Sequence, residues 1–187
     1  MGFFNRFFKK VEEVNKAEAD ISELESAFTL ASPLDEANDF WKEIAQNIIV
    51  NAVKATDNTV ERAFILIDMG QQPSFHIFYQ IDGHLLKWYE LENPTIIEKI
   101  QNELLPQASN VSKAVNDQFI QVNHPKISFA ELQFEWATGA WFSHIIWEDN
   151  DDINLKAEEI SSQWFNTLSE EIKNKPLDSD AKLSWYP

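Results

Sequence analysis

Cysteine is absent from this chain of 187 residues, and glycine occurs only four times. Without cysteine there is no disulfide framework, zinc ribbon or thiol nucleophile, and the composition fits a reducing cytosol. The glycines form neither Gly-x-Gly-x-x-Gly nor a phosphate-binding loop, and no Gly-x-Ser-x-Gly nucleophile elbow occurs. No stretch reaches the roughly 18 apolar residues of a membrane-spanning helix. We therefore expect a cytoplasmic protein without a nucleotide or other cofactor.

Basic side chains are also scarce, and their distribution is uneven. Lysine and arginine together number 15 against 31 acidic residues, which gives a net charge of −16. Residues 1–10 contain three basic residues and no acid, so the other 177 residues carry 12 basic against 31 acidic residues, a net charge of −19. Such a charge repels nucleic acid and anionic lipid and attracts basic proteins over a Debye length of roughly 8 Å. A basic partner protein and no nucleic-acid partner are expected, with solubility alone as the other explanation.

The composition is that of a globular protein, with 44% hydrophobic and 25% charged residues. The length suffices for one domain with a hydrophobic core. We expect an N-terminal amphipathic helix in residues 1–30, a single domain in residues 31–175 and a C-terminal tail in residues 176–187. The tail is expected to lie on the surface, pinned by Trp185 and Tyr186.

The N-terminal segment carries an apolar stripe with the spacing of three and four residues that is typical of a helix. The stripe comprises Phe3, Phe7, Val11, Val14, Ala17, Ile21, Leu24 and Phe28. Such a stripe needs burial, and we expect the helix to dock on the domain or on a second copy of the chain, which would then be a homo-oligomer. Contact with a membrane surface is the alternative, which the basic residues of the first ten positions favour and the later acids oppose.

Residues 128–147 give the clearest pattern, that of a β-hairpin. Between Ala130 and Trp136, apolar and polar residues alternate with the period of two of a strand that has one buried face. Thr138 and Gly139 are the expected turn residues, because glycine adopts the positive φ of a tight turn without strain. The turn predicts three cross-strand pairs, namely Trp136 with Trp141, Phe134 with Ser143, and Leu132 with Ile145.

Prolines, glycines and capping residues indicate where the remaining helices and strands begin and end. Helices are predicted at residues 33–55, 94–119 and 153–173, and strands at residues 60–68, 75–81 and 84–90. Ser32 is the expected N-cap before Pro33, the dipeptide Asp82-Gly83 predicts a hairpin turn, and Pro106 should break the second helix. The predicted fold class is α+β, with an antiparallel sheet of about five strands (a three-stranded meander plus the hairpin) and helices packed on it in the order α-α-βββ-α-ββ-α.

Patterns for catalysis and metal binding are weak. The four histidines lie on separate segments, without a ligand partner three or four positions away in a helix. A calcium loop beginning at Glu148 fails because Ile153 stands where the sharp turn needs glycine. Glu131 and Glu135 could form an acid–base pair, although such pairs are common on plain strand surfaces. No catalytic residue, cofactor or metal is therefore predicted.

Acidic side chains are densest around the second face of the hairpin and its exit. That face mixes acidic and apolar groups, as a covered or a partner-binding face would, and it comprises Glu131, Gln133, Glu135, Phe142, His144 and Ile146. Acids at a helix N-terminus also stabilise its dipole by about 0.3–1 kcal/mol each, so helix capping is an alternative role for the run after Trp147. We predict a partner-binding surface that comprises Glu131, Glu135, Phe142, Ile146, Glu148, Asp149, Asp151 and Asp152.

The order of the elements, together with two sequence segments, resembles the YezG-like immunity proteins. The segments are WKEIAQNII at residues 41–49 and IIWEDNDD at residues 145–152, and the resemblance covers residues 36–170. It implies a small cytosolic bacterial antitoxin that binds and neutralises a cognate secreted toxin, commonly a nuclease. The second hypothesis is a structural or adaptor protein that acts through its N-terminal helix, by self-association or at a membrane surface. An enzyme of unrecognised type is the third.

Overall fold

The computed structural model describes residues 31–148, 156–174 and 182–186. The chain divides into two compact units, Met1–Ser32 and Pro33–Pro187, and every element described below belongs to the second unit. The predicted amphipathic helix of residues 1–30 lies outside the described residues.

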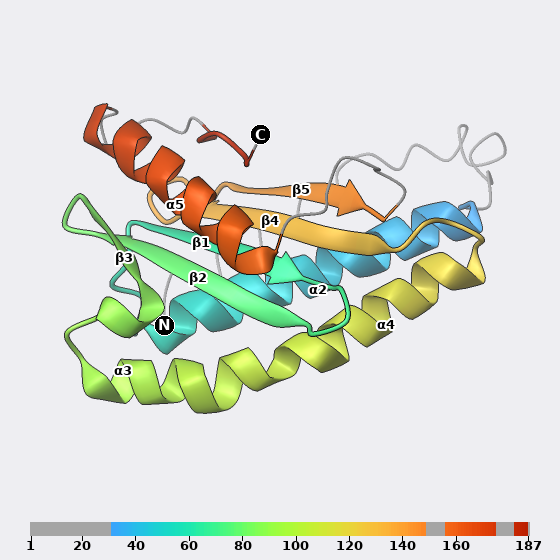
Figure 1. The fold of residues 1–187 in the computed structure, drawn as a ribbon, viewed down its shortest axis with the longest axis horizontal. Helices are drawn as coiled ribbons and strands as arrows, with labels where there is room; N and C mark the ends of the chain where they lie inside the picture. The colour runs from blue at the N-terminus through green and yellow to red at the C-terminus, as the bar shows by residue number, and fades with distance from the viewer. Residues whose placement is uncertain (1–30, 149–155, 175–181, 187) are drawn as a thin grey trace, which may run out of the picture. The chain divides into compact units, whose positions relative to one another are not determined.

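Within the described residues, helices and strands follow the predicted order, and the α+β fold class is confirmed (Figure 1). The elements are α2 (Pro33–Ala55), β1 (Arg62–Asp68), β2 (Ser74–Ile81), β3 (His84–Lys87), η1 (Trp88–Glu90), α3 (Pro94–Lys99), η2 (Ile100–Leu104), η3 (Leu105–Gln107), α4 (Ala108–Gln121), β4 (Ile127–Glu135), β5 (Trp141–Trp147) and α5 (Ala157–Asn174). The strands form one five-stranded sheet in the order β3-β2-β1-β4-β5, and each neighbouring pair is antiparallel.

Three of the local signals have the predicted effect. α2 begins at Pro33, and β2 and β3 are joined by Asp82 and Gly83, whose φ angles of 49° and 76° give a hairpin turn with two positive φ values. The second helix breaks around Pro106, where a π-helical turn (η2) and a 3₁₀ turn (η3) separate α3 from α4. Proline causes this break because it has no N–H to donate to the preceding turn.

The register of the β4–β5 hairpin differs from the predicted one by two residues. Phe134, in place of Trp136, lies opposite Trp141, so the predicted cross-strand pairs are wrong. The loop is longer than a two-residue turn, because Gly139 (φ 71°) donates its N–H to the carbonyl of Glu135 at 3.0 Å. A shift of two residues leaves each side chain on its predicted face, since side chains alternate along a strand.

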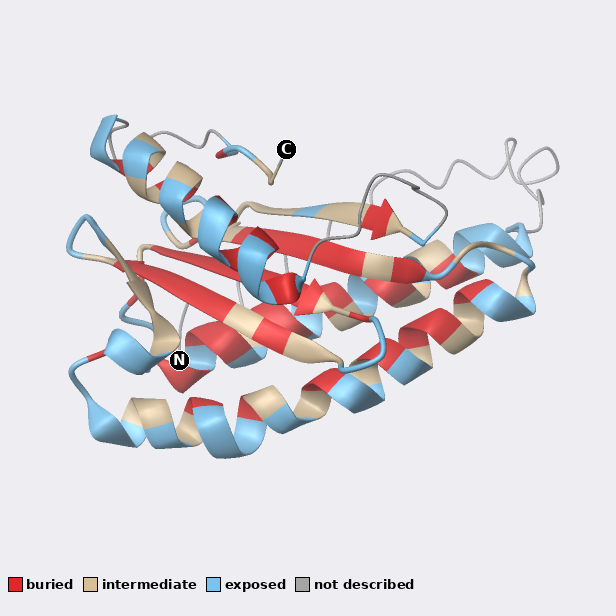
Figure 2. Ribbon diagram, in the orientation of Figure 1, coloured by how far each residue is buried: buried red, intermediate tan, exposed pale blue. Residues whose placement is uncertain are grey.

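Helices cover both faces of the sheet: α2 and α4 pack on one face, and α5 packs on the other (Figure 1). Buried residues accordingly gather on the strands and on the sheet-facing sides of the helices (Figure 2). The central strand β1 is buried at six of its seven residues, which explains why its sequence is a continuous apolar run and does not alternate. On the α5 side, Trp164 packs edge-on against Phe64 and Phe78, with ring centroids 6.0 and 5.8 Å away.

Residues 182–186, here called the C-terminal segment, belong to the α5 face of the sheet. Leu183 is 1% exposed and packs in the same core cluster as Trp164, with Trp185 and Tyr186 against its border. Lys182 and Ser184 are exposed and the two aromatic residues are half-buried, so these five residues lie on the surface and are pinned as predicted. The exception is Leu183, which is buried in the core.

No helix in the described ranges combines the length and the apolar character that crossing a membrane requires.

Candidate functional site

The polar stripe of β4 was the main feature of the predicted partner surface, and it is buried. Glu131, Gln133 and Glu135 are 0%, 4% and 6% exposed, and Ile146 of the neighbouring strand is 6% exposed. The prediction that these side chains lie on an exposed face is therefore wrong. Strand alternation places them on the predicted second face, but α5 and the C-terminal segment cover that face.

At one end of the stripe, Glu135 forms a buried ion pair with Arg62. The Arg62 Nη2 atom lies 2.7 Å from Glu135 Oε1. The Arg62 side chain is 4% exposed and the Glu135 side chain is 8% exposed. The second carboxylate oxygen accepts a hydrogen bond from the Thr138 hydroxyl at 2.8 Å. Mutual neutralisation allows both charges to remain away from water, since an unpaired buried charge costs several kcal/mol.

In the middle of the stripe, the amide of Gln133 binds the C-terminal segment in both directions. Gln133 Nε2 donates to the carbonyl of Leu183, and the Leu183 N–H donates to Gln133 Oε1, both at 3.0 Å. The next carbonyl, that of Ser184, accepts a hydrogen bond from Trp164 Nε1 of α5 at 3.0 Å. The segment is thus hydrogen-bonded to the sheet and to the helix above it.

At the other end of the stripe, Glu131 accepts two hydrogen bonds. The Tyr186 N–H donates to it at 2.9 Å, and His144 Nδ1 lies 3.0 Å from its second oxygen. Trp185 stacks on the His144 ring with a centroid distance of 5.5 Å. Both carboxylates of the stripe therefore bind protein groups beneath a cover. Their geometry supports a structural role, in contrast to the acid–base role considered from the sequence.

The remaining residues of the predicted partner surface lie in or beyond β5. Phe142 is half-buried, and Glu148 is exposed, with its carboxylate 3.7 Å from the Lys126 ammonium. Asp149, Asp151 and Asp152 lie outside the described residues. Of the predicted surface within the described residues, Glu148 is exposed and Phe142 is half-buried.

A groove of about 310 Å³, here called the α2–β5 groove, separates α2 from the outer strand β5. Its lining comprises Asp35, Asn38, Asp39, Trp41, Lys42, Ser143 and Ile145. Asp35 and Asp39 are exposed, and Asp39 forms a surface ion pair with Lys42 at 2.7 Å. Sequence reasoning did not find this groove, because it places α2 residues next to residues about a hundred positions later in the chain.

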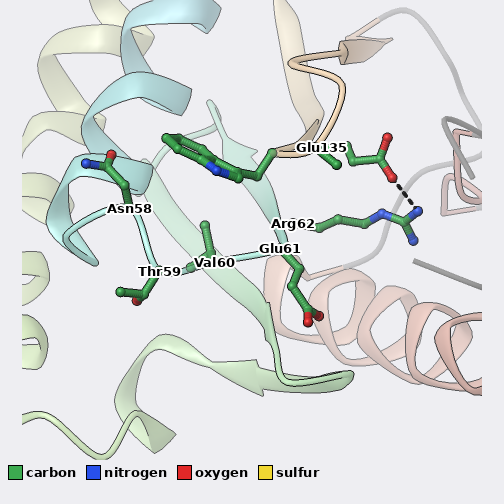
Figure 3. A pocket seen from close by; sticks show the side chains of 8 residues that line it. Asn58, Thr59, Val60, Glu61, Arg62 and Glu135 are labelled. Atoms are coloured by element: carbon green, nitrogen blue, oxygen red, sulfur yellow. Dashed lines mark hydrogen bonds and ion pairs between the residues drawn. The ribbon is translucent and has the colours of Figure 1, made fainter. Parts of the chain in front are cut away.

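A second pocket, of about 280 Å³, lies where the connection between α2 and β1 meets the hairpin loop (Figure 3). It is lined by Asn58, Thr59, Val60, Glu61, Arg62, Glu135, Trp136 and Ala137. Its charged groups have protein partners: Arg62 and Glu135 point toward each other, and the Glu61 carboxylate accepts the Gly83 N–H at 3.0 Å. This lining contains no histidine, serine or lysine and gives no indication of catalysis.

A third pocket, of about 400 Å³, lies beside the β2–β3 turn. It is lined by Thr56, Thr59, Ile81, Asp82, His84, Leu86, Leu91, Glu92, Asn93 and Ile96. Across the described residues, no group of three or more histidines and acids is arranged to hold a metal ion.

A cluster at the β1–β2 connection contains two titratable groups with shifted pKa values, His76 and Asp68. The hydroxyl of Ser74 lies 3.2 Å from His76 Nε2, and burial lowers the pKa of His76 despite the opposing charges of Glu158 and Asp68. Burial also raises the pKa of Asp68, whose carboxylate accepts the Gly70 N–H at 2.8 Å. A serine beside a neutral histidine resembles a nucleophile and base, but none of the three pockets described above is lined by either residue.

No family model matches this chain, and no curated protein matches it either.

Proposed function

We propose that this chain is a non-catalytic acidic binding protein of the immunity type, which neutralises a cognate toxin, such as a nuclease, by occupying its basic surface. The observation that carries the proposal is the exposed acidic surface around the outer strand β5. The acids Asp35 and Asp39 of α2 lie along one side of it, and Glu148 stands at its end, followed in sequence by three aspartates.

The physical argument is one of charge complementarity. A nuclease that binds phosphates presents a basic cleft, and a protein of net charge −16 is attracted to that cleft before contact. Complementary charges at the rim of an interface mainly accelerate association and reject other partners. An inhibitor gains from both effects, because it must reach the toxin before the toxin reaches its substrate.

The structural observations favour binding over catalysis. The carboxylates of the β4 stripe, which offered the best acid–base pair in the sequence, bind Arg62 and the C-terminal segment. Glu131 and Glu135 are thus held by protein groups and are 0% and 6% exposed. The acids near β5 are exposed, and Asp39 and Glu148 pair with Lys42 and Lys126 at the surface. A basic partner can compete for them, because an exposed ion pair contributes only about 0–1 kcal/mol.

Co-expression tests the proposal. Each reading frame that neighbours the gene of this chain is induced in a host cell, alone and together with this chain. Growth arrest by the toxin alone and recovery with the chain are the expected results. If neither neighbouring reading frame arrests growth, or if arrest persists at equal expression of this chain, the immunity proposal fails.

A further inference from the structure

Strand β5 is an edge of the sheet with an unusual composition. No strand among the described residues pairs with its outer side. Its seven residues, Trp141–Trp147, include no lysine, arginine, acid or proline. Edge strands are normally protected against pairing by charges, prolines or bulges, so an uncharged outer edge is suited to accept another strand.

The hydrogen bonds of the hairpin show which peptide groups face outward. Glu135 N–H donates to the carbonyl of Ala140 at 2.9 Å, so these residues form a hydrogen-bonded pair. Such pairs recur at every second residue of an antiparallel ladder, which directs the peptide groups of Phe142 and His144 toward β4. The peptide groups of the intervening residues, including Ser143, therefore point away from the sheet.

The side chains of those intervening residues lie in an acidic environment. Ser143 and Ile145 line the α2–β5 groove, and its α2 wall carries Asp35, Asp39 and the Lys42 that pairs with Asp39. On the opposite face of β5 is the apolar, half-buried Phe142. A strand added at this edge would thus meet carboxylates on one face and an aromatic ring on the other, because its side chains alternate.

We propose that the outer edge of β5 binds an extended segment of a basic protein by strand addition, with cationic side chains facing Asp35 and Asp39 and apolar side chains facing Phe142. The inference deepens the proposed function, on which it rests for the identity of the partner. The net charge favours a segment of another protein over a second copy of this chain as the added strand. Two copies joined at this edge would each carry a net charge of −16 and would bring their α2 acids to one interface.

A heptapeptide of alternating lysine and valine is the direct probe, with the glutamate and valine heptapeptide as its matched control. Amide hydrogen exchange is measured by NMR on the full chain with and without each peptide. The lysine peptide should slow exchange at the Ser143 and Ile145 amides by about tenfold or more, because new hydrogen bonds protect them. The Phe142 and His144 amides, which already face β4, should change little, and the glutamate peptide should protect none of these amides.

Two pairs of variants test the geometry. Ser143→Pro removes an outward N–H without removing a bond to β4, so it should abolish protection of Ile145, whereas Ser143→Ala should retain it. Asp35→Asn with Asp39→Asn should weaken binding of the lysine peptide several-fold. Glu98→Gln with Glu103→Gln, which changes the net charge equally at exposed positions outside the groove, should weaken it much less.

Two results would overturn the inference. The first is slow exchange of Ser143 and Ile145 in the chain without peptide, since the edge would then already be covered; sedimentation would show whether a second copy covers it. The second is binding of the lysine peptide without added protection at these amides. Charge attraction alone would then explain the binding. If the chain fails to neutralise a toxin but the lysine peptide protects the β5 amides, the immunity proposal is rejected and strand addition is not. If the chain neutralises a toxin but the peptide protects none of these amides, strand addition alone is rejected.

Discussion

At the scale of single residues, the Arg62–Glu135 ion pair is the feature whose disruption should cost the most stability. It lies between the sheet and its cover. Removal of one partner leaves a buried charge without compensation, and this costs about 3–5 kcal/mol. Replacement of both by apolar side chains of similar volume avoids that cost.

We therefore predict that Glu135→Ala lowers the free energy of unfolding by about 3–5 kcal/mol, and that Arg62→Met with Glu135→Leu lowers it by much less. Urea unfolding measures both. The surface pair Lys42–Asp39, whose side chains are 59% and 70% exposed, is the control, and Asp39→Ala should change stability by about 1 kcal/mol at most. Equal losses in the single and double variants would show that the pair contributes through packing and not through charge compensation.

The second prediction at this scale concerns His76 and pH. Burial places the pKa of folded His76 below the value of 6.5 that it has in the unfolded chain. Its contribution to stability is therefore complete above pH 6.5 and is lost as the pH falls through the folded pKa. The difference in unfolding free energy between the wild type and His76→Asn should shrink from pH 7.5 to pH 5. A constant difference over this range would contradict the role of burial.

The β4 stripe shows which features of single residues could be predicted from the sequence and which could not. Alternation along β4 correctly assigned Glu131, Gln133 and Glu135 to one face, because that property is local. The cover on that face comes from Leu183, 50 positions after Gln133, and from the helix that precedes it. No local pattern could reveal these contacts, although the paired aromatic residues near the C-terminus did indicate that the tail is anchored.

At the scale of elements, predictions succeeded where the determinant is a short backbone signal. Pro33, the Asp82-Gly83 turn and Pro106 each restrict backbone torsions or hydrogen bonding directly, and the structure has the expected helix start, hairpin and helix break. The prediction of the β4–β5 register failed because the loop has four residues where a two-residue turn was expected. The Gly139 N–H closes it on the Glu135 carbonyl at 3.0 Å, and the Thr138 hydroxyl donates to the Glu135 carboxylate at 2.8 Å.

The C-terminal segment gives a prediction about an element. Deletion of residues 182–187 would leave Glu131, Gln133 and Trp164 without their backbone partners. We expect a loss of about 2–4 kcal/mol in the free energy of unfolding, since each unsatisfied buried group costs about 1–3 kcal/mol and returning water offsets part of this. Urea unfolding with Ser184→Ala as the control, which retains the backbone bonds, measures the effect. A truncated chain as stable as the full one would mean that the segment does not hold the sheet face together.

At the scale of the whole molecule, the division into two units bears on the N-terminal stripe. The second unit, Pro33–Pro187, contains both hydrophobic clusters and the complete sheet. Its folding should therefore not depend on residues 1–30. If those residues form the predicted helix, its apolar stripe needs a surface to cover it.

We predict that deletion of residues 1–30 leaves a folded domain whose solution mass or melting temperature is changed. Sedimentation reports a lost oligomer, and thermal unfolding reports a lost docking contact within one chain. An unchanged mass together with an unchanged melting temperature would contradict this prediction. Binding of the full chain, but not of the truncated one, to anionic vesicles would then support the hypothesis of a membrane contact.

The distribution of charge gives the last prediction, which concerns association with the proposed toxin partner. Reversal of Asp149, Asp151 and Asp152 to lysine should slow association at low salt, because charges at the rim of an interface act mainly by steering. The rate for the wild type should also fall as salt is added, whereas the rate for the variant should depend less on salt. The cost in stability should stay below about 1 kcal/mol, because α5 begins at Ala157, five residues after Asp152, and a charge acts on a helix dipole mainly within the first turn.

Stopped-flow mixing with the toxin measures these rates. The control carries Glu92→Lys, Glu98→Lys and Glu103→Lys, which change the net charge equally at exposed positions away from β5. Equal slowing in both variants would mean that total charge, and not the exit of β5, steers the partner. A triple aspartate variant that associates at the wild-type rate would show that these three residues do not steer the partner. The exposed Asp35 and Asp39 of the α2–β5 groove would then be the next acids to reverse.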